Sequence, residues 1–186
     1  MNFPSLLDLA AQTAREAGAH LRQALGTQLV VEQSLAHDIK LQIDVEIQTL
    51  IQTRLLATHP DHHILGEEGG HGSGGVGTEW IIDPIDGTVN LSYGIPHFCV
   101  SIACRQNGTT QIGVIYDPMR DELFTAHLGA GAFLNGKPLR VSTRTDLAET
   151  ALSIGFSKSH ETLLKCLELY QFYGPRTRKL RAMGSA

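Results

Sequence analysis

The sequence has no long hydrophobic run, few cysteines and no export pattern. No stretch of its 186 residues is long and apolar enough to span a membrane, which takes about 20 apolar residues in a row. The N-terminus lacks a basic region followed by an apolar core, so we expect no secretion signal. The cysteines Cys99, Cys104 and Cys166 have no metal-ligand spacing. Their odd number predicts reduced thiols in a cytoplasmic protein.

An excess of positive charge is also missing. The chain has 15 Lys and Arg against 19 Asp and Glu, which gives a net charge of −4. A general nucleic-acid binder shows a basic footprint, so we expect neither a nucleic acid nor a membrane as partner. An apolar content of 42% with 18% charged residues is typical of globular proteins. The length suffices for one sizeable domain with its own core.

What the chain does contain is a stretch, residues 80–90 (WIIDPIDGTVN), in which acidic residues follow an apolar run. Because proline cannot donate to a sheet ladder, we expect a strand to stop at Pro84. Asp83 and Asp86 would then lie together at the end of that strand. Carboxylate oxygens in such an arrangement suit Mg²⁺, which bridges carboxylates to a substrate phosphate.

The next residues, Gly87 and Thr88, predict a turn or the start of a helix. Backbone N–H groups at a helix start favour a phosphate. A D-P-x-D-G stretch by itself is often only a turn, because Asp, Pro and Gly each suit turns. A second acidic pair, Glu67-Glu68, also follows a short apolar stretch close upstream. Two acidic strand ends favour a metal and phosphate site over a simple turn.

The rest of the chain alternates between helical and strand patterns. Apolar residues recur at helical spacing between Ser5 and Leu25, after Asp44, and from Ser159 to Tyr170. We interpret Asp44 as the cap of its helix. The adjacent histidines at 62 and 63 are expected on an exposed surface. Strands are expected over residues 98–105, 110–116, 122–127, 131–134, 137–141 and 151–156. Helices flanking a series of strands predict an α+β fold.

The stretch 80–90 resembles the first signature of the inositol monophosphatase family, W-[IV]-[IL]-D-P-[IL]-D-G-T-x-N. Glu67-Glu68 matches that family's G-E-E motif, and the likeness continues through residues 93–103, 113–118 and 131–136. The family consists of Mg²⁺-dependent, lithium-sensitive sugar phosphatases. The resemblance implies the N-terminal α/β layer of their fold, an antiparallel sheet flanked by helices. It also implies that the protein hydrolyses phosphomonoesters. Members of the family are commonly homodimers, so we expect a homodimer here.

The resemblance gives each site residue a role. Glu67, Asp83 and the carbonyl of Ile85 would hold one Mg²⁺, and Asp83 would bridge to a second ion that Asp86 also binds. A third, weaker ion would complete the set of two or three. Glu67 and Thr88 would orient the attacking water, so Glu67, Thr88 and Asp86 are the expected catalytic residues.

Further residues are implied around this centre. Asp86 and the N–H groups of Gly87 and Thr88 would bind the substrate phosphate ester. Glu68 and Asp38 would lie behind the metal ligands and support them. Asp38 opens a stretch resembling a second family motif, D-[LI]-V-T-x-x-D, but Lys-Leu stands here in place of Val-Thr.

The chain ends in Arg181–Ala186, which matches the family pattern R-x-x-G-[ST]-A. In the family this pattern leads into a second half with the signature W-D-x-A-x-G, whose Asp completes a metal site. The only tryptophan here is Trp80. We therefore expect residues 1–186 to be an N-terminal metal- and phosphate-binding domain, with the C-terminal domain absent or truncated after Ala186. Such a chain would bind the second ion weakly and turn over slowly.

Three readings of the function remain open. The first is hydrolysis of inositol monophosphate or a related sugar phosphate. The second is another activity of the same superfamily, whose members cleave fructose 1,6-bisphosphate, histidinol phosphate or 3′-phosphoadenosine nucleotides. The third is a non-catalytic fragment that binds a sugar phosphate or a metal.

Overall fold

The computed structural model describes residues 2–25, 31–35, 38–70, 77–155 and 159–186. The chain forms two compact units. The first contains the residues up to Leu139 together with Ser185, and the second contains Arg140–Gly184 and Ala186. No helix among the described residues is long and apolar enough to cross a membrane.

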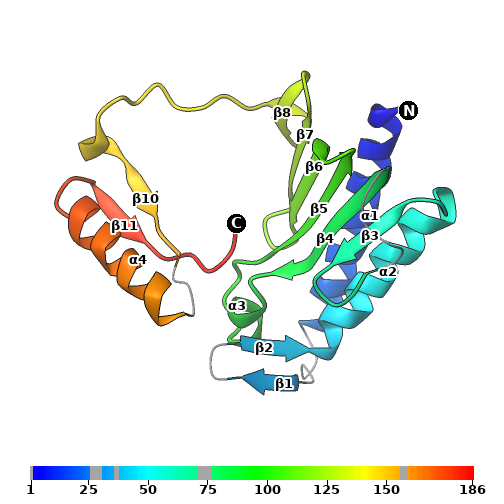
Figure 1. Ribbon diagram of the computed structural model, residues 1–186, viewed down its shortest axis with the longest axis horizontal. Coiled ribbons are helices and arrows are strands. Elements are labelled where there is room, and N and C mark those ends of the chain that lie inside the picture. The colour runs from blue at the N-terminus through cyan, green and yellow to red at the C-terminus, as the bar shows by residue number, and fades with distance from the viewer. Residues whose placement is uncertain (1, 26–30, 36–37, 71–76, 156–158) are drawn as a thin grey trace. The chain divides into compact units, whose positions relative to one another are not determined.

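A seven-stranded sheet forms the first unit (Figure 1). Its strands lie in the order β3-β4-β5-β6-β7-β8-β9. Only β3 and β4 pair in parallel, and every other neighbouring pair is antiparallel. This arrangement confirms the predicted α+β class. The strands are β3 (His63–Gly66), β4 (Thr78–Asp86), β5 (Cys99–Gln106), β6 (Thr109–Asp117), β7 (Glu122–His127), β8 (Gly131–Leu134) and β9 (Lys137–Pro138).

Two long helices, α1 (Phe3–Ala24) and α2 (Gln42–Thr58), lie side by side on one face of this sheet (Figure 1). Each buries its apolar stripe against the strands, as the 3.6-residue spacing predicts. Burial of this apolar surface drives the packing of helices on sheet. The largest fully buried side chains are Trp80, Tyr116, Leu6, Leu21, Leu41, Ile47, Ile51, Leu55, Ile85, Leu91, Ile102 and Ile112.

Two of the turns between neighbouring strands of the sheet are Asn-Gly pairs. Asn107-Gly108 joins β5 to β6, and Asn135-Gly136 joins β8 to β9. All four of these residues have positive φ, between 47° and 80°. Asn and Gly tolerate this left-handed conformation, and paired positive φ values match the twist of a hairpin.

Three shorter elements complete the first unit. The strands β1 (Val31–Leu35) and β2 (Asp38–Leu41) form an antiparallel pair, and α3 (Thr88–Ser92) follows β4. The helix α3 has only five residues, so its dipole is small. At the start of α1, Pro4 lies inside the first turn, and Ser5 Oγ donates back to Asn2 O at 2.7 Å. Proline suits this turn because its missing N–H would find no helical partner there.

The second unit contains the parallel pair β10 (Ala151–Ser153) and β11 (Lys179–Arg181), with α4 (His160–Tyr173) between them in the chain. A short 3₁₀ turn, Leu147–Glu149, precedes β10. Ser159 caps α4, since its Oγ accepts the N–H of Thr162 at 3.2 Å. None of the residues of α4 is buried, and Leu164, Leu167 and Leu169 are about half exposed, so part of the apolar surface of α4 is open to solvent.

Candidate metal and phosphate site

The strand β4 does not stop at Pro84 as the sequence predicts. It continues to Asp86, and its pairing with β5 shifts register between Asp83 and Asp86. A bulge accommodates proline because the residue there need not donate to the ladder. Bulges also re-aim side chains, and they are frequent beside active sites. The bulge therefore sets the directions of the two acidic side chains at this end of the strand.

Asp83 is the carboxylate with the least favourable surroundings. Its Oδ1 is buried and accepts no hydrogen bond from the described part of the chain. Burial first, then repulsion from Glu67 and Asp86, raises the pKa of Asp83 from 3.8 to about 7. A side-chain hydrogen bond with Glu67 also favours the protonated form of Asp83. The three acids predicted to bind metal thus lie close enough to interact.

Glu67 reaches this place because of the parallel pairing of β3 with β4. Just past β3, its N–H donates to Ile82 O at 3.3 Å. The next residues are held by Gln48 of α2, whose Oε1 accepts the N–H of Glu68 at 2.8 Å and whose Nε2 donates to Gly69 O at 2.7 Å. A Cβ on Gly66 would come within 2.5 Å of the Gln48 side-chain amide, so a larger residue there would displace Gln48 from these hydrogen bonds. Sequence reasoning missed Gln48, which fixes the acidic loop.

Thr88 and Asp44 form a second polar pair. Thr88 Oγ1 lies 2.9 Å from Ile85 O and 3.3 Å from Asp44 Oδ1. The other oxygen of Asp44 accepts the N–H of Leu41 at 2.8 Å. Asp44 thus caps α2 from the third position inside the helix, whereas Leu41 occupies the N-cap position that the sequence prediction gave to Asp44. Burial is the main cause that raises the pKa of Asp44 to about 6, and the nearby Glu68 and Glu67 add to it. Asp44 therefore serves the helix with one oxygen and the site with the other.

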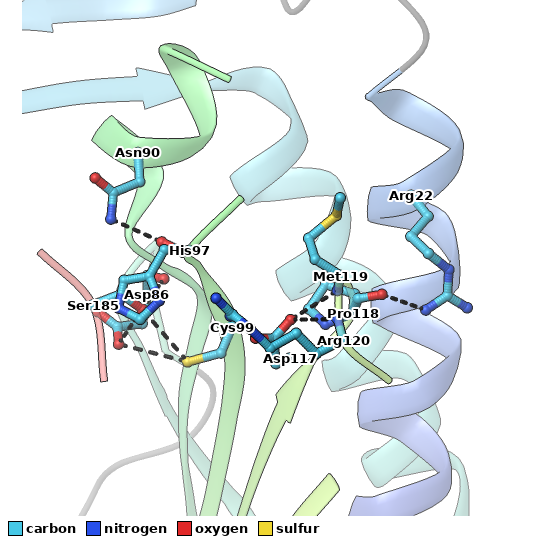
Figure 2. Close-up of polar contacts among 10 residues, drawn as sticks. All are labelled: Arg22, Asp86, Asn90, His97, Cys99, Asp117, Pro118, Met119, Arg120 and Ser185. Carbon is cyan, nitrogen blue, oxygen red and sulfur yellow. Dashed lines mark hydrogen bonds and ion pairs between the residues drawn. The ribbon is translucent and has the colours of Figure 1, made fainter. Parts of the chain in front are cut away.

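Asp86 lies in a small hydrogen-bond cluster (Figure 2). Ser185 Oγ lies 3.0 Å from Asp86 Oδ2 and 2.9 Å from Asp86 O. The thiol of Cys99, which pairs opposite Asp86 on β5, donates to the same Oδ2 at 3.6 Å. Burial and the charge of Asp86 raise the pKa of this thiol to about 12, so it stays protonated.

Gly87 connects β4 to α3 with φ near 99°. An added Cβ would lie 3.0 Å from both His97 O and the Cβ of Ser185. Glycine is thus required here by conformation and by space. The segment that holds His97 is itself fixed by Asn90, whose Nδ2 donates to His97 O at 2.8 Å (Figure 2).

The residues present fit a divalent cation. A half-buried carboxylate with an unpartnered oxygen, crowded by two further acids, is relieved by a cation that replaces its proton. Among the described residues, no three His, Cys, Asp or Glu side chains are already gathered as a metal cluster. The fit therefore depends on the burial of Asp83 and on its repulsion by Glu67 and Asp86.

The remaining sequence predictions have different outcomes. Asp38 begins β2, but its side chain lies outside what the structure describes, so its predicted role is untested. His62 is buried rather than exposed, and its Nδ1 accepts the indole N–H of Trp80 at 3.0 Å. The three cysteines are all described and none forms a disulfide. Asp44 carried a signal in the sequence, because it is the last Asp of the D-[LI]-V-T-x-x-D pattern.

Comparison with known sequences identifies relatives over nearly the whole chain. The sequence model of the inositol monophosphatase family matches residues 4–186. The Nus factor SuhB of Vibrio cholerae is 40% identical over 169 residues, covering 87% of this chain and 63% of the relative. That of Escherichia coli K12 is 42% identical over 154 residues, covering 81% of this chain and 58% of the relative. The chain thus spans about three fifths of the length of these two relatives.

Solved structures show the same fold. The extragenic suppressor protein suhB of Bartonella henselae matches with a TM-score of 0.90 at 32% identity, covering 98% of this chain and 71% of that one. The IMPase of Thermotoga maritima matches with a TM-score of 0.85 at 33% identity, over 97% and 69% of the two chains. A structure of SaIMPase-II with bound inositol monophosphate matches with a TM-score of 0.79 at 30% identity, over 97% and 66%.

Proposed function

The chain belongs to the inositol monophosphatase family, and from this premise we propose that the protein is a Mg²⁺-dependent phosphomonoester hydrolase. Its substrate would be inositol monophosphate or a related sugar phosphate. The observation that carries the proposal is the buried Asp83 oxygen beside Glu67 and Asp86. The inositol monophosphate bound to the similar SaIMPase-II supports the substrate class.

Glu67, Asp83, Asp86 and the carbonyl of Ile85 would hold the metal. Bound Mg²⁺ would neutralise phosphate charge, lower the pKa of water and stabilise the leaving oxygen. The acidic side chains would present their oxygens from two neighbouring strand ends, β3 and β4. In the same proposal, the N–H groups of Gly87 and Thr88, with the carboxylate of Asp86, would position the phosphate ester.

Thr88 would orient the attacking water, and Asp44 would accept its proton. A hydroxyl has one donor hydrogen and two acceptor lone pairs. When Thr88 donates to Asp44, its lone pairs can accept a hydrogen from water and so orient it. The raised pKa of Asp44, about 6, suits a group that accepts a proton near neutral pH. Glu67 would hold the water from the other side, and Glu68 would keep the field around Asp44 negative.

A phosphate-release screen tests this function. The panel contains inositol monophosphate, fructose 1,6-bisphosphate, histidinol phosphate and a 3′-phosphoadenosine nucleotide, each with Mg²⁺, with EDTA, and with Mg²⁺ plus Li⁺. We expect slow release that requires Mg²⁺, is fastest for inositol monophosphate and is inhibited by Li⁺. Asp86→Asn should lower turnover at least tenfold while leaving the circular dichroism spectrum unchanged. Release that persists in EDTA, or equal turnover of Asp86→Asn, would contradict the proposal.

A non-catalytic binding role is the second candidate. Relatives that match this chain carry the name Nus factor, and the chain spans 58% to 63% of the length of those compared above. Under this alternative, calorimetry would show binding of inositol monophosphate while the screen shows no phosphate release with any member of the panel. The expectations of a cytoplasmic location and a homodimer belong to the proposal as well, and size-exclusion chromatography with light scattering tests the dimer.

A further inference from the structure

Two donors outside the predicted ligand set converge on one oxygen of Asp86 (Figure 2). Ser185 Oγ lies 3.0 Å from Asp86 Oδ2, and Cys99 Sγ lies 3.6 Å from the same atom. One donor, Cys99, lies on the neighbouring strand β5. The other, Ser185, lies 99 residues after Asp86 in the chain. Both residues lie in stretches that resemble the family, but neither was assigned a role in the site from the sequence.

Such donors affect how a carboxylate binds a cation. A hydroxyl and a protonated thiol carry no charge, so they hold the anion without neutralising it. Hydrogen bonds to an ionised acceptor are stronger than those between neutral groups. Ser185 has one hydroxyl hydrogen, and when it is directed at Oδ2 rather than at Asp86 O, the two bonds on this oxygen restrict rotation of the carboxylate plane and give its other oxygen a defined direction. Groups that orient metal ligands in this way commonly change metal affinity or activity 10- to 100-fold when removed.

We propose that Ser185 and Cys99 are positioning residues that fix the carboxylate of Asp86 for divalent cation binding. This inference rests on the proposed function, in which Asp86 is a metal ligand. Ser185 makes the larger contribution, because its hydroxyl is the stronger donor and the contact is shorter. The thiol supports the same oxygen from the β5 side.

A purely structural role for Ser185 predicts something different. Ser185 Oγ also lies 2.9 Å from Asp86 O, and its Cβ packs at the place where Gly87 has no side chain. If these contacts only anchor the chain, the shape of the side chain matters and the hydroxyl does not. A pair of variants with equal shape, one with and one without a hydroxyl, separates the two roles.

The experiment is isothermal titration of the 186-residue chain with Mn²⁺, which is used as the probe for the Mg²⁺ site. Ser185→Thr and Ser185→Val have the same branched shape, and only the first retains the hydroxyl. We expect Ser185→Val to bind Mn²⁺ about tenfold more weakly than Ser185→Thr. Cys99→Ala should bind Mn²⁺ about twofold to threefold more weakly than the unsubstituted chain, because a thiol is a weaker donor than a hydroxyl, whereas Cys99→Ser keeps a donor and should bind Mn²⁺ about as tightly as the unsubstituted chain. Urea unfolding of each pair checks that both members are folded.

Asp86→Asn is titrated beside these variants. If it weakens Mn²⁺ binding while Ser185→Val and Ser185→Thr bind equally, the positioning role is overturned and the proposed function stands. If Asp86→Asn binds Mn²⁺ as tightly as the unsubstituted chain, Asp86 is not a ligand, and both proposals fail. A tenfold difference within the Ser185 pair, together with weak binding by Asp86→Asn, supports the inference.

Discussion

The strand β4 carries a buried acid, Glu79, near one end and a half-buried acid, Asp83, near the other, and the surroundings of these two acids are opposite. At one end Glu79, 6% exposed, forms an ion pair with Arg105 of the neighbouring β5. At the other end Asp83 meets two further acids, Glu67 and Asp86, and one of its oxygens has no hydrogen-bond partner among the described residues. An ion pair compensates a buried charge, whereas crowding a charge with like charges lowers the free energy of unfolding. Such strained acids cluster at functional sites.

The largest effect is expected on turnover at the crowded end. Thr88→Val keeps the shape of the side chain and removes the hydroxyl that contacts Asp44. Loss of a group that manages proton transfer typically costs about 10²-fold or more in rate, so we expect phosphate release to fall by that order. Thr88→Ser is the matched control and should retain most activity. Turnover of the valine variant within a factor of two of the serine variant would refute the role of this hydroxyl.

The paired end should show the largest loss of stability. Glu79→Gln removes the charge that compensates Arg105, whose side chain is 37% exposed. Breaking a buried pair costs about 3–5 kcal/mol, and partial exposure of Arg105 reduces this, so we expect the free energy of unfolding to fall by about 1–3 kcal/mol. Urea unfolding in EDTA at pH 8 measures it. An unchanged urea midpoint would mean that the pair does not stabilise the sheet.

Asp83→Asn should change stability in the opposite direction. Asn mimics the neutral acid and removes repulsion from Glu67 and Asp86. In EDTA at pH 8 we expect the free energy of unfolding to rise by about 1 kcal/mol, a figure that allows for solvent screening of a half-buried group.

The pH dependence follows from the same raised pKa. The pKa of Asp83 is 3.8 in the unfolded chain and about 7 in the folded chain. Between these values the folded state binds more protons, so stability falls as pH rises, and the full penalty is present above pH 7. The advantage of Asp83→Asn should therefore be large at pH 8 and small at pH 4.5. An advantage that is equal at both pH values would show that repulsion is not its cause.

The smallest effect concerns Trp80, the only tryptophan. Its indole donates to the neutral Nδ1 of His62, which also stacks on His59 at 4.5 Å between ring centroids. Burial, then the positive charge of His59, lowers the pKa of His62 below 6.5, while Asp61 acts in the opposite direction. We expect a modest change in tryptophan fluorescence with a midpoint below pH 6.5. His62→Phe should abolish it, and a midpoint above 6.5 would contradict the assignment.

Sequence patterns located the elements that depend on local chemistry. The strands β7 and β8 have the predicted bounds, and the Asn-Gly turns have the positive φ values that this residue pair favours. Acidic residues after two apolar runs were enough to predict that Glu67, Asp83 and Asp86 interact. These features depend on neighbours in the chain, which a sequence displays directly.

Features set by distant partners were missed. Pro84, which has no N–H, lies inside β4 because a bulge against β5 means that no N–H is needed at this position. His62 is buried because Trp80, on the adjacent strand, offers it a donor. Asp44 was interpreted only as a cap, since its second partner, Thr88, lies 44 residues away. Ser185 was likewise beyond reach, because its contact with Asp86 spans 99 residues.

The most direct test of the metal site is the effect of Mg²⁺ on unfolding at pH 8. A ligand that binds only the folded state raises the unfolding midpoint, by an amount that grows with the logarithm of the ratio of ligand concentration to Kd. We predict that millimolar Mg²⁺ raises the thermal midpoint of the unsubstituted chain by several degrees, and leaves that of Asp83→Asn unchanged. Equal shifts in both proteins, or no shift in either, would contradict a cation site built on Asp83.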